Sequence, residues 1–288
     1  GVVPGTNSKT NYNAMATIKR DTIYTNVALK PDGTVWWEGH DDPPPAEAVD
    51  WQGKPWKPGA GKAAHPNSRI TVPARQCPAI SPQFDEPQGV PISAILFGGR
   101  RARVAPLVFE AFDWRHGVFL GATMASETTA AATGQVGVVR RDPMAMLPFC
   151  GYNMADYFAH WLRVGARSDE APSIYHVNWF QTGADGSFLW PGFGENLRVL
   201  RWILARSRGE AEGRRTPIGV LPTKESLDLA GLDLPESSIE RLLSVDVEAW
   251  TRELADMKTF FDKFGQRLPE ELWQEHDRLA HRLQLEAA

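Results

Sequence analysis

The spacing of hydrophobic and polar positions changes several times along the chain, and each change predicts a different element. Thr22–Ala28 and Thr34–Trp37 are short runs rich in β-branched and aromatic residues. They flank Lys30–Gly33, whose Pro-Asp-Gly has the chemistry of a turn, so we predict a hairpin there. Ile92–Phe97 is a compact apolar run that ends in two glycines, the pattern of a buried strand followed by a tight turn.

Two segments in the middle of the chain have the spacing of amphipathic helices. Tyr152–Val164 and Asn196–Ala205 carry apolar residues three and four positions apart. Val138–Val139 and Ile174–Trp179 are further strand candidates. The sequence therefore predicts a mixed α/β body that extends to about residue 235.

After Pro235 the pattern becomes helical, and residues 236–288 are predicted to form C-terminal packing helices. One apolar stripe at helical spacing is followed by a second: Val247, Trp250, Leu254, Met257, Phe261 and Phe264, then Leu268, Leu272, Leu279 and Leu283. A coiled-coil partner is an alternative, but the stripes are short and aromatic, which favours packing against a core.

Residues 39–88 are rich in Pro, Gly, Asp and Trp and have almost no periodicity, so we expect long ordered loops there. No Gly/Ser or Pro linker divides the chain, and we treat its 288 residues as one α/β unit.

The amino-acid composition argues against nucleic-acid-binding, membrane-associated and disulfide-rich proteins. The net charge of -4 provides no basic surface for nucleic acid or an anionic membrane. Cys77 and Cys150 are too few for a disulfide framework, and no apolar run of about 18 residues or leader pattern occurs. We therefore expect a cytoplasmic protein without a nucleic-acid or membrane partner. The chain opens at Gly1 without an initiator Met, which indicates either a cut inside a longer protein or a trimmed chain.

The segment Asn178–Asn196, with the sequence NWFQTGADGSFLWPGFGEN, holds the most informative chemistry. Phe180, Phe188 and Phe193 alternate with glycines, a combination unsuited to a core strand. Aromatic rings on glycine-punctuated loops suit a slot for a flat base, and the amide of Asn196 can both donate and accept hydrogen bonds. An aromatic surface loop without a ligand is the alternative on composition alone.

Two arginine sites are candidates for binding anions. Arg69 ends the motif HPNSR, after Asn67 and Ser68, and the pair Arg100-Arg101 follows two glycines. The planar guanidinium matches phosphate and carboxylate groups with two parallel hydrogen bonds. Taken singly, each arginine is more often part of a surface ion pair.

Met124–Gly137 is rich in small residues and predicts either a short Ala-rich helix or a mobile loop that closes over a ligand. Pro58–Ala63 superficially suggests a phosphate loop, but Trp56 and Ala63 stand where that motif requires glycine and a hydroxyl residue, so we reject it. No histidine or carboxylate spacing in the chain predicts a metal site.

Together these segments resemble GTP-dependent phosphoenolpyruvate carboxykinases. The resemblance covers Gly1 to about Leu232 and rests on about a dozen collinear motifs, among them GVVPGT at Gly1, WWEG at Trp36, HPNSR at His65, FGGRR at Phe97, HGVF at His116, SETTAAA at Ser126, DPMAMLPF at Asp142, HVNWF at His176, FLWPGFGEN at Phe188 and TPIG at Thr216.

The resemblance implies the mixed-sheet nucleotide-binding C-terminal domain of that family over residues 1–288. It also implies conversion of oxaloacetate and GTP to phosphoenolpyruvate, carbon dioxide and GDP in gluconeogenesis. Mn²⁺ is the expected cofactor, with Mg²⁺ accompanying GTP. Decarboxylation would form an enolate that attacks the γ-phosphate, and we expect a monomer when the enzyme is complete.

The resemblance also implies roles for individual residues. Asn67, Ser68 and Arg69 would contact the substrate, while Arg69 and Arg100 would be catalytic and reach the nucleotide. The residues implied to bind GTP are Arg69, Arg100, Phe180, Phe188, Phe193, Gly194, Glu195 and Asn196, and residues 126–137 resemble the family's lid.

The family's phosphate loop, reactive cysteine and Mn²⁺ ligands align upstream of Gly1, and this chain offers no replacements. We therefore expect the upstream N-terminal portion of the same enzyme as a partner, and no turnover by the chain alone. The competing hypotheses are a fragment that binds guanine nucleotides without catalysis and an aromatic peptide-binding surface.

Overall fold

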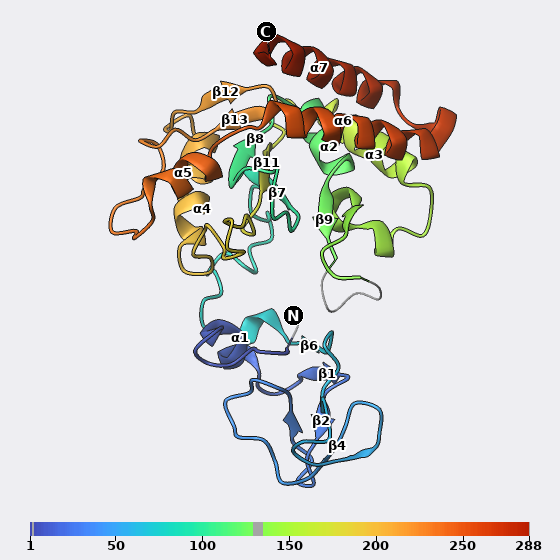
Figure 1. Cartoon of the computed structure of the whole chain (residues 1–288). Coiled ribbons are helices and arrows are strands. Elements are labelled where there is room, and N and C mark those ends of the chain that lie inside the picture. Colours follow the sequence, from blue (N-terminus) through green and yellow to red (C-terminus); the bar gives the residue numbers. More distant parts are fainter. Residues whose placement is uncertain (2, 129–134, 288) are drawn as a thin grey trace. The chain divides into compact units, whose positions relative to one another are not determined.

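A computed structural model describes residues 1, 3–128 and 135–287 of the chain (Figure 1). Backbone contacts divide them into two compact units. Gly1–Pro91 form unit 1, and the described residues from Ile92 onward form unit 2. This differs from the single α/β unit expected from the sequence. Residues 81–91, which precede this boundary, are rich in Pro, Gln and acidic side chains, and a Pro-rich segment of this kind acts as a semi-rigid connection.

Unit 1 contains a small antiparallel sheet of four two-residue strands in the order β3-β2-β4-β5. The strands are β2 (Ala28–Leu29), β3 (Val35–Trp36), β4 (Ala48–Val49) and β5 (Pro55–Trp56). The predicted hairpin is confirmed as β2 and β3, with Ala28 opposite Trp36. Trp36 and Trp56 stack with ring centroids 5.6 Å apart, and this contact forms the core of the sheet.

The remainder of unit 1 surrounds the buried Trp37. It comprises α1 (Tyr12–Thr17), β1 (Ile23–Thr25), β6 (Arg69–Thr71) and the 3₁₀ turn η1 (Ala74–Gln76). β1 pairs antiparallel with β6, and Trp37 packs with Val3, Ala64 and Ile70. Residues 39–88 therefore contain short strands where the sequence predicted only loops. Strands of two or three residues are too short to produce a readable alternation.

Unit 2 is built on a five-stranded mixed sheet in the order β12-β13-β8-β11-β7. The strands are β7 (Ala94–Gly98), β8 (Val108–Glu110), β11 (Ser173–Val177), β12 (Arg214–Thr216) and β13 (Gly219–Leu221). β7 and β11 are parallel, whereas the other neighbours are antiparallel. The predicted strands at Ile92–Phe97 and Ile174–Trp179 are thus confirmed with slightly shifted ends.

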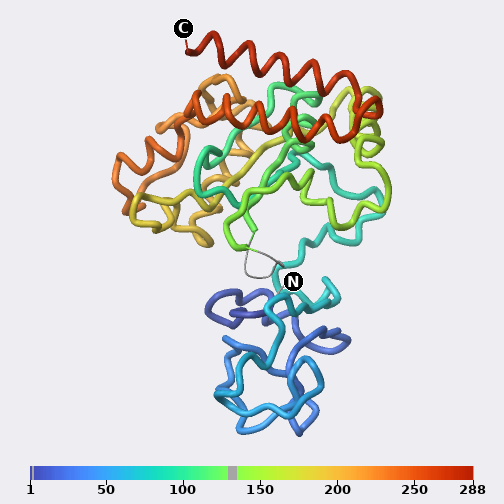
Figure 2. Tube along the Cα trace, turned by 45° about the vertical axis from the view of Figure 1, so that its right-hand side comes forward, coloured from blue at the N-terminus to red at the C-terminus, as the bar shows by residue number. Residues whose placement is uncertain are grey.

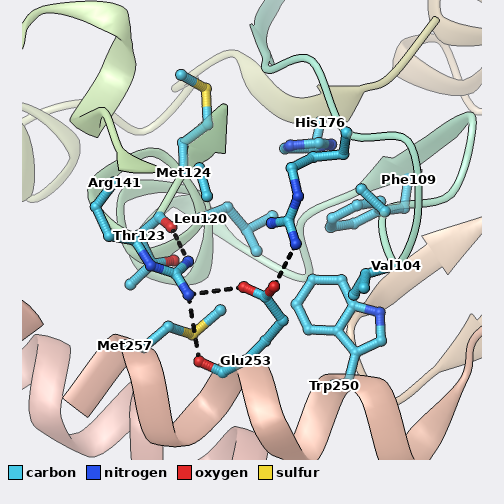
Figure 3. Close-up of a pocket in the computed structure, with 13 residues that line it drawn as sticks. Val104, Phe109, Leu120, Thr123, Met124, Arg141, His176, Trp250, Glu253 and Met257 are labelled. Atoms are coloured by element: carbon cyan, nitrogen blue, oxygen red, sulfur yellow. Dashed lines mark hydrogen bonds and ion pairs between the residues drawn. The ribbon is translucent and has the colours of Figure 1, made fainter. Parts of the chain in front are cut away.

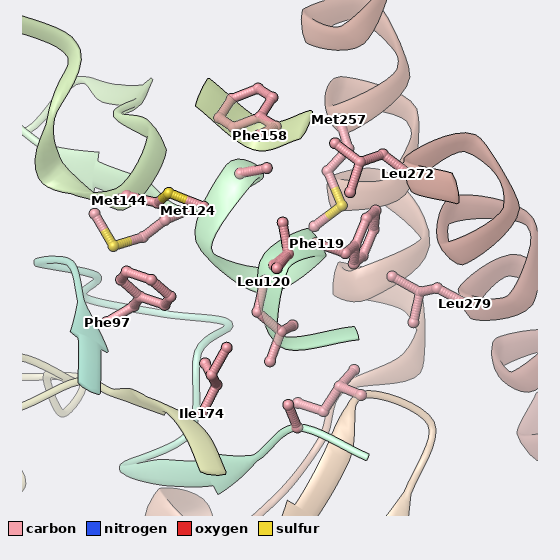
Figure 4. Packing of buried hydrophobic residues seen from close by; sticks show 14 of the residues in the cluster. Phe97, Phe119, Leu120, Met124, Met144, Phe158, Ile174, Met257, Leu272 and Leu279 are labelled. Atoms are coloured by element: carbon pink, nitrogen blue, oxygen red, sulfur yellow. The ribbon is translucent and has the colours of Figure 1, made fainter. Parts of the chain in front are cut away.

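Both faces of this sheet are buried, as alternate residues of β11 demonstrate. Ile174 belongs to a core cluster with residues of α2, α6 and α7, whereas Tyr175 and Val177 belong to a second cluster with residues of α4 and α5. Successive side chains of a strand point to opposite faces, so the helices cover the sheet on both sides. Figure 4 shows the first cluster, in which Phe119, Met257 and Leu272 come together from three helices.

Helices make up the rest of unit 2. They are α2 (Trp114–Ala122), α3 (Met154–Gly165), α4 (Asn196–Ser207), α5 (Glu236–Leu242), α6 (Val247–Phe261) and α7 (Glu270–Ala287). Asp113, Asn153 and Asp246 begin α2, α3 and α6 by accepting a hydrogen bond from a backbone N–H of the first turn. α6 and α7 run side by side, as Figure 2 shows, and confirm the predicted C-terminal packing helices.

Shorter elements complete unit 2. β9 (Ala125–Glu127) pairs antiparallel with β10 (Val139–Arg141). The 3₁₀ turns η2 (Pro143–Ala145), η3 (Leu147–Phe149) and η4 (Asp262–Arg267) precede α3 and α7. Among the helices of the described residues, none is both long enough and apolar enough to span a membrane.

Candidate functional site

The turn after β7 places Arg100 at the end of the sheet and depends on glycine. A Cβ atom on Gly99 would lie 2.3 Å from the carbonyl oxygen of Ala125. The backbone of the turn is joined to β9 by three hydrogen bonds: Arg100 N donates to Ser126 Oγ (3.0 Å), Glu127 N donates to Arg100 O (2.8 Å), and Ala102 N donates to Glu127 Oε1 (2.7 Å). The two glycines thus allow a close approach that fixes the backbone of Arg100.

The Arg100 side chain lies on an aromatic residue of the glycine-rich loop. Its guanidinium carbon is 3.9 Å from the centroid of Phe180, a favourable cation–π contact. Phe180 in turn meets Phe188 edge to face, with centroids 5.9 Å apart. The structure therefore brings together an arginine and aromatic residues that lie far apart in the sequence. Phe188 and Phe193 are 58% and 77% exposed, so two large apolar rings face solvent.

Asn196, the first residue of α4, is held in one orientation by a buried tryptophan. Trp190, only 1% exposed, donates its indole N–H to Asn196 Oδ1 at 2.9 Å. Since the indole is a donor only, the carboxamide oxygen must face Trp190 and the NH₂ group faces away. No described residue accepts a hydrogen bond from that NH₂ group. The sequence identified Asn196 but not the tryptophan that orients it.

The loop that leads into α4 turns at Gly192, whose φ of +89° is readily adopted by glycine. Gly192 O accepts hydrogen bonds from the backbone N–H groups of Glu195 (2.8 Å) and Asn196 (3.2 Å). The carboxylate of Glu195 pairs with Arg198, which also donates to Asp228 O at 2.9 Å. Glu195 is thus engaged within the unit, while Gly194 is exposed beside it.

Arg101, the next residue, belongs to a buried ion-pair network with Glu253, which Figure 3 shows beside Arg141. Glu253 on α6 pairs with Arg101 and also accepts a hydrogen bond from Arg141 Nη2 at 2.7 Å. Burial acts to raise the pKa of Glu253, but hydrogen bonds and charges from Arg101 and Arg141 outweigh it and lower the pKa overall. The carboxylate thereby links the turn after β7, β10 and α6.

Glu253 and Arg141 were not identified from the sequence, although a signal was present. Glu253 lies three residues after Trp250 and four before Met257, within the apolar stripe of α6. A charge on the buried face of a helix requires a buried partner.

His176 on β11 lies beside this network. It stacks on Phe109 with centroids 5.0 Å apart, and burial together with the charge of Arg101 lowers its pKa to about 4. His116 on α2 has a pKa lowered to about 3, first by burial and then by Arg282, Arg215 and Arg278. Both imidazoles are therefore neutral near pH 7.

Asn67, Ser68 and Arg69 form a compact group in unit 1. Arg69 Nε and Nη2 donate to Asn67 Oδ1 at 3.1 and 2.8 Å, and Asn67 N donates to His65 Nδ1 at 3.0 Å. Arg69 is exposed, whereas Ser68 is fully buried and its hydroxyl has no partner in the described part of the chain. The orientation of Arg69 is thus set by its neighbour in the same motif.

The predicted site residues accordingly fall into two groups. Asn67, Ser68 and Arg69 belong to unit 1, and the predicted residues from Arg100 to Asn196 belong to unit 2. The middle of the predicted lid, residues 129–134, lies outside the described residues. Its flanks form the antiparallel pair of β9 and β10.

Metal ligands do not come together in the described part of the chain. No three His, Cys, Asp or Glu side chains there are arranged to hold a metal ion. The residues described here therefore do not form a Mn²⁺ site.

Comparison with known proteins agrees with these motifs. Residues 1–282 match the family model described as the phosphoenolpyruvate carboxykinase C-terminal P-loop domain. A phosphoenolpyruvate carboxykinase [GTP] of Anaeromyxobacter dehalogenans is 55% identical over 284 residues, which cover 98% of this chain and 48% of that protein. The enzyme of the same name from Chlamydia abortus is 52% identical over 287 residues, covering 99% and 48%.

The chain spans about half the length of these curated relatives. With a family model matched over nearly all of its residues, the chain belongs to the GTP-dependent phosphoenolpyruvate carboxykinase family and corresponds to its C-terminal P-loop domain.

Proposed function

We propose that this chain supplies the guanine-nucleotide pocket and part of the substrate site of a GTP-dependent phosphoenolpyruvate carboxykinase. The complete enzyme would convert oxaloacetate and GTP to phosphoenolpyruvate, carbon dioxide and GDP in the cytoplasm. Unit 2 would then have the nucleotide-binding fold of that family's C-terminal domain. The names of the relatives support the reaction. The oriented amide of Asn196, together with the exposed Phe188 and Phe193 earlier in the same loop, is the observation that supports guanine as the base.

Asn196 provides the means to select guanine over adenine. With its oxygen turned to Trp190, its NH₂ group is the available donor. Guanine presents the carbonyl acceptor O6 at the position where adenine presents an amino donor, so the NH₂ group can pair with guanine and opposes adenine. Phe188 and Phe193 would stack on either base, because every base has a π-face. Stacking therefore contributes affinity, and Asn196 contributes the choice of base.

Arg100 is suited to the phosphates of the same nucleotide. Its guanidinium already lies against Phe180, within the aromatic group that would hold the base. As negative charge develops on the transferred phosphoryl group, a cation with a preorganised backbone stabilises the transition state. The backbone of Arg100 donates a hydrogen bond to Ser126 Oγ and accepts one from Glu127 N, and these bonds limit the movement needed to reach that position.

Asn67, Ser68 and Arg69 would contact oxaloacetate and the enolate formed by its decarboxylation. Arg69 is exposed and held by Asn67, which leaves its third guanidinium nitrogen free to donate to a carboxylate. The buried Ser68 hydroxyl, which has no partner among described residues, is a second donor in the same motif.

The metal chemistry would come from the upstream portion of the enzyme. Mn²⁺, with Mg²⁺ on the nucleotide, would neutralise phosphate charge when bound, but the residues described here do not fit such a site. This chain's own part of the reaction is to bind the base, orient the nucleotide and supply cations for substrate and phosphate.

A fragment that binds guanine nucleotide without turnover is the second candidate, because the chain covers about half of its relatives. Calorimetric titration with GTP and ATP tests the pocket, and we expect GTP to bind more tightly by about 1–3 kcal/mol. Equal affinities would contradict the role of Asn196.

Oxaloacetate-dependent GDP formation with Mn²⁺ tests the reaction. We expect no turnover by the 288-residue chain alone and recovery when the upstream portion is added. Guanine-selective binding without recovery would favour the second candidate. Turnover by the chain alone would show that metal and phosphates bind at residues we have not assigned.

A further inference from the structure

A second pocket in unit 2 combines three arginines from three different elements. It has a volume of about 410 Å³, within the range of small-molecule sites. Arg103 comes from the turn after β7, Arg241 from α5 and Arg252 from α6. Arg100 and Phe180 do not line it, so it differs from the guanine pocket proposed above.

Two of these arginines lack the partners that such side chains usually have. Arg103 and Arg241 are exposed, and neither side chain forms a hydrogen bond or ion pair with any residue of the described chain. Arg252 pairs with Glu248 one turn earlier on α6. Acidic residues outnumber basic ones in this chain, 35 to 31, so a shortage of carboxylates does not account for the unpaired arginines.

The acidic residue that lines this pocket is already engaged. Asp246 accepts a hydrogen bond from Ala249 N at 2.9 Å and begins α6. The positive end of the helix dipole offsets its charge. Arg103 and Arg241 therefore bring two unpaired positive charges to a pocket whose lining carboxylate, Asp246, is already engaged at the start of α6, and an anion in the pocket would offset those charges.

We propose that this pocket binds a small oxyanion with two or more negatively charged groups. Phosphate and carboxylate share the planar pair of acceptor oxygens that matches a guanidinium, so both chemistries suit Arg103 and Arg241. A pocket of this volume takes a small molecule and excludes the face of a macromolecule.

The residues that line the arginine pocket are close in sequence to the proposed nucleotide-binding residues. Gln181, which lines the pocket, directly follows Phe180 and donates to Ala105 O at 2.8 Å. Arg103 follows Arg100 by three residues in the same turn. An anion bound here would contact the turn through Arg103 and the aromatic loop through Gln181 without occupying the proposed nucleotide site, because neither Arg100 nor Phe180 lines this pocket.

The proposal is tested by calorimetric titration of the 288-residue chain at low ionic strength with two probes, inorganic pyrophosphate and citrate. The two arms separate phosphate from carboxylate chemistry. We expect saturable binding of at least one probe, and retention of that binding when GTP is also present. Failure of both probes to bind at millimolar concentration, or displacement of the bound probe by GTP, would overturn the proposal.

Variants then locate the site. Arg103→Gln and Arg241→Gln should each lower the affinity for the probe by at least about tenfold, which is the loss expected for a charge-assisted hydrogen bond. Arg241→Lys should weaken it less, because the charge remains. Arg163→Gln is the matched control, since Arg163 is exposed on α3 and lies outside this pocket. Equal affinities of Arg241→Gln and Arg163→Gln would rule out the pocket, whatever the fate of the proposed reaction.

Discussion

Asn196 and Trp190 show, at the scale of single residues, how a buried side chain can orient the polar group of a partly exposed one. The indole N–H fixes the direction of the amide, and the amide then offers donors alone to a ligand. In the proposed pocket, selection of guanine would thus depend on Trp190, a residue that is itself buried.

We predict that Asn196→Asp lowers GTP affinity by about 1–3 kcal/mol and changes ATP affinity much less. The carboxylate still accepts from Trp190, but it cannot donate to guanine O6 and can accept from the amino group of adenine. Competition titrations with GTP and ATP provide the measurement. Asn153→Asp, which adds the same charge at the start of α3, is the control. An equal loss for both nucleotides would indicate charge repulsion with the phosphates instead.

Glu253 is the second residue whose contribution can be isolated. The side chains of Arg101 and Arg141 are 9% and 7% exposed, so Glu253→Gln leaves two buried cations without their shared anion. We expect a loss of about 3 kcal/mol in the free energy of unfolding, measured by urea titration. Asp256→Asn is the control, because Asp256 pairs with Arg141 but is 61% exposed and should contribute less than about 1 kcal/mol. Equal losses would mean that the network behaves as a surface ion pair.

At the scale of elements, the turn between β7 and β8 positions three arginines of unit 2. The same turn carries Arg100 toward the aromatic loop, Arg101 into the buried network and Arg103 into the arginine pocket. Its course depends on the approach of Gly99 to the backbone of β9.

We predict that Gly99→Ala destabilises unit 2 by about 1–3 kcal/mol, the usual cost of overpacking, because the new methyl group meets a backbone carbonyl that cannot rotate away. Nucleotide affinity should fall in the same variant, since the backbone that positions Arg100 has to move. Gly151→Ala is the matched control, because nothing lies within 4 Å of the added Cβ and no positive φ is required there. If the two variants were equally stable, the approach of residue 99 to the carbonyl oxygen of Ala125 would not limit the side chain at this position.

At the scale of the whole molecule, two buried neutral histidines make stability depend on pH. His176 and His116 remain unprotonated in the folded chain until the pH falls to about 4 and about 3. The unfolded chain binds those protons near pH 6.5, so between pH 6.5 and 4 the unfolded state holds more protons. The contribution of each neutral imidazole is therefore complete above about pH 6.5 and is lost as the pH falls through this window.

We predict that His176→Phe reduces this dependence by up to about 1.4 kcal/mol per pH unit, because it removes one titrating group and keeps an aromatic ring beside Phe109. Urea unfolding at pH 7, 6 and 5 measures the slope. The exposed His281, changed to Gln, should leave the slope as it is in the parent chain. A parent-like slope in His176→Phe would show that His176 is charged in the folded state.

The sequence alone was sufficient for elements whose patterns are long and one-sided. α3, α4, α6 and α7 have apolar stripes at helical spacing, and β7 and β11 are apolar runs bounded by turn residues. α2 was missed for a physical reason: seven of its nine residues are buried, so it shows no polar face and includes two glycines. The arginine and aromatic motifs were recognised as candidates because their chemistry is local to each motif, and their roles stay predictions.

Only the tertiary structure decided which of these residues meet. Arg101 and Arg141 reach Glu253 across 152 and 112 residues of sequence, and Arg100 finds Phe180 across a sheet whose strand order is not the order of the chain. Local propensity cannot encode such pairings. They form when helices and strands pack their apolar faces together, because that packing also sets the positions of the polar side chains on the same elements. The division after Pro91 and the pocket of Arg103, Arg241 and Arg252 have the same origin.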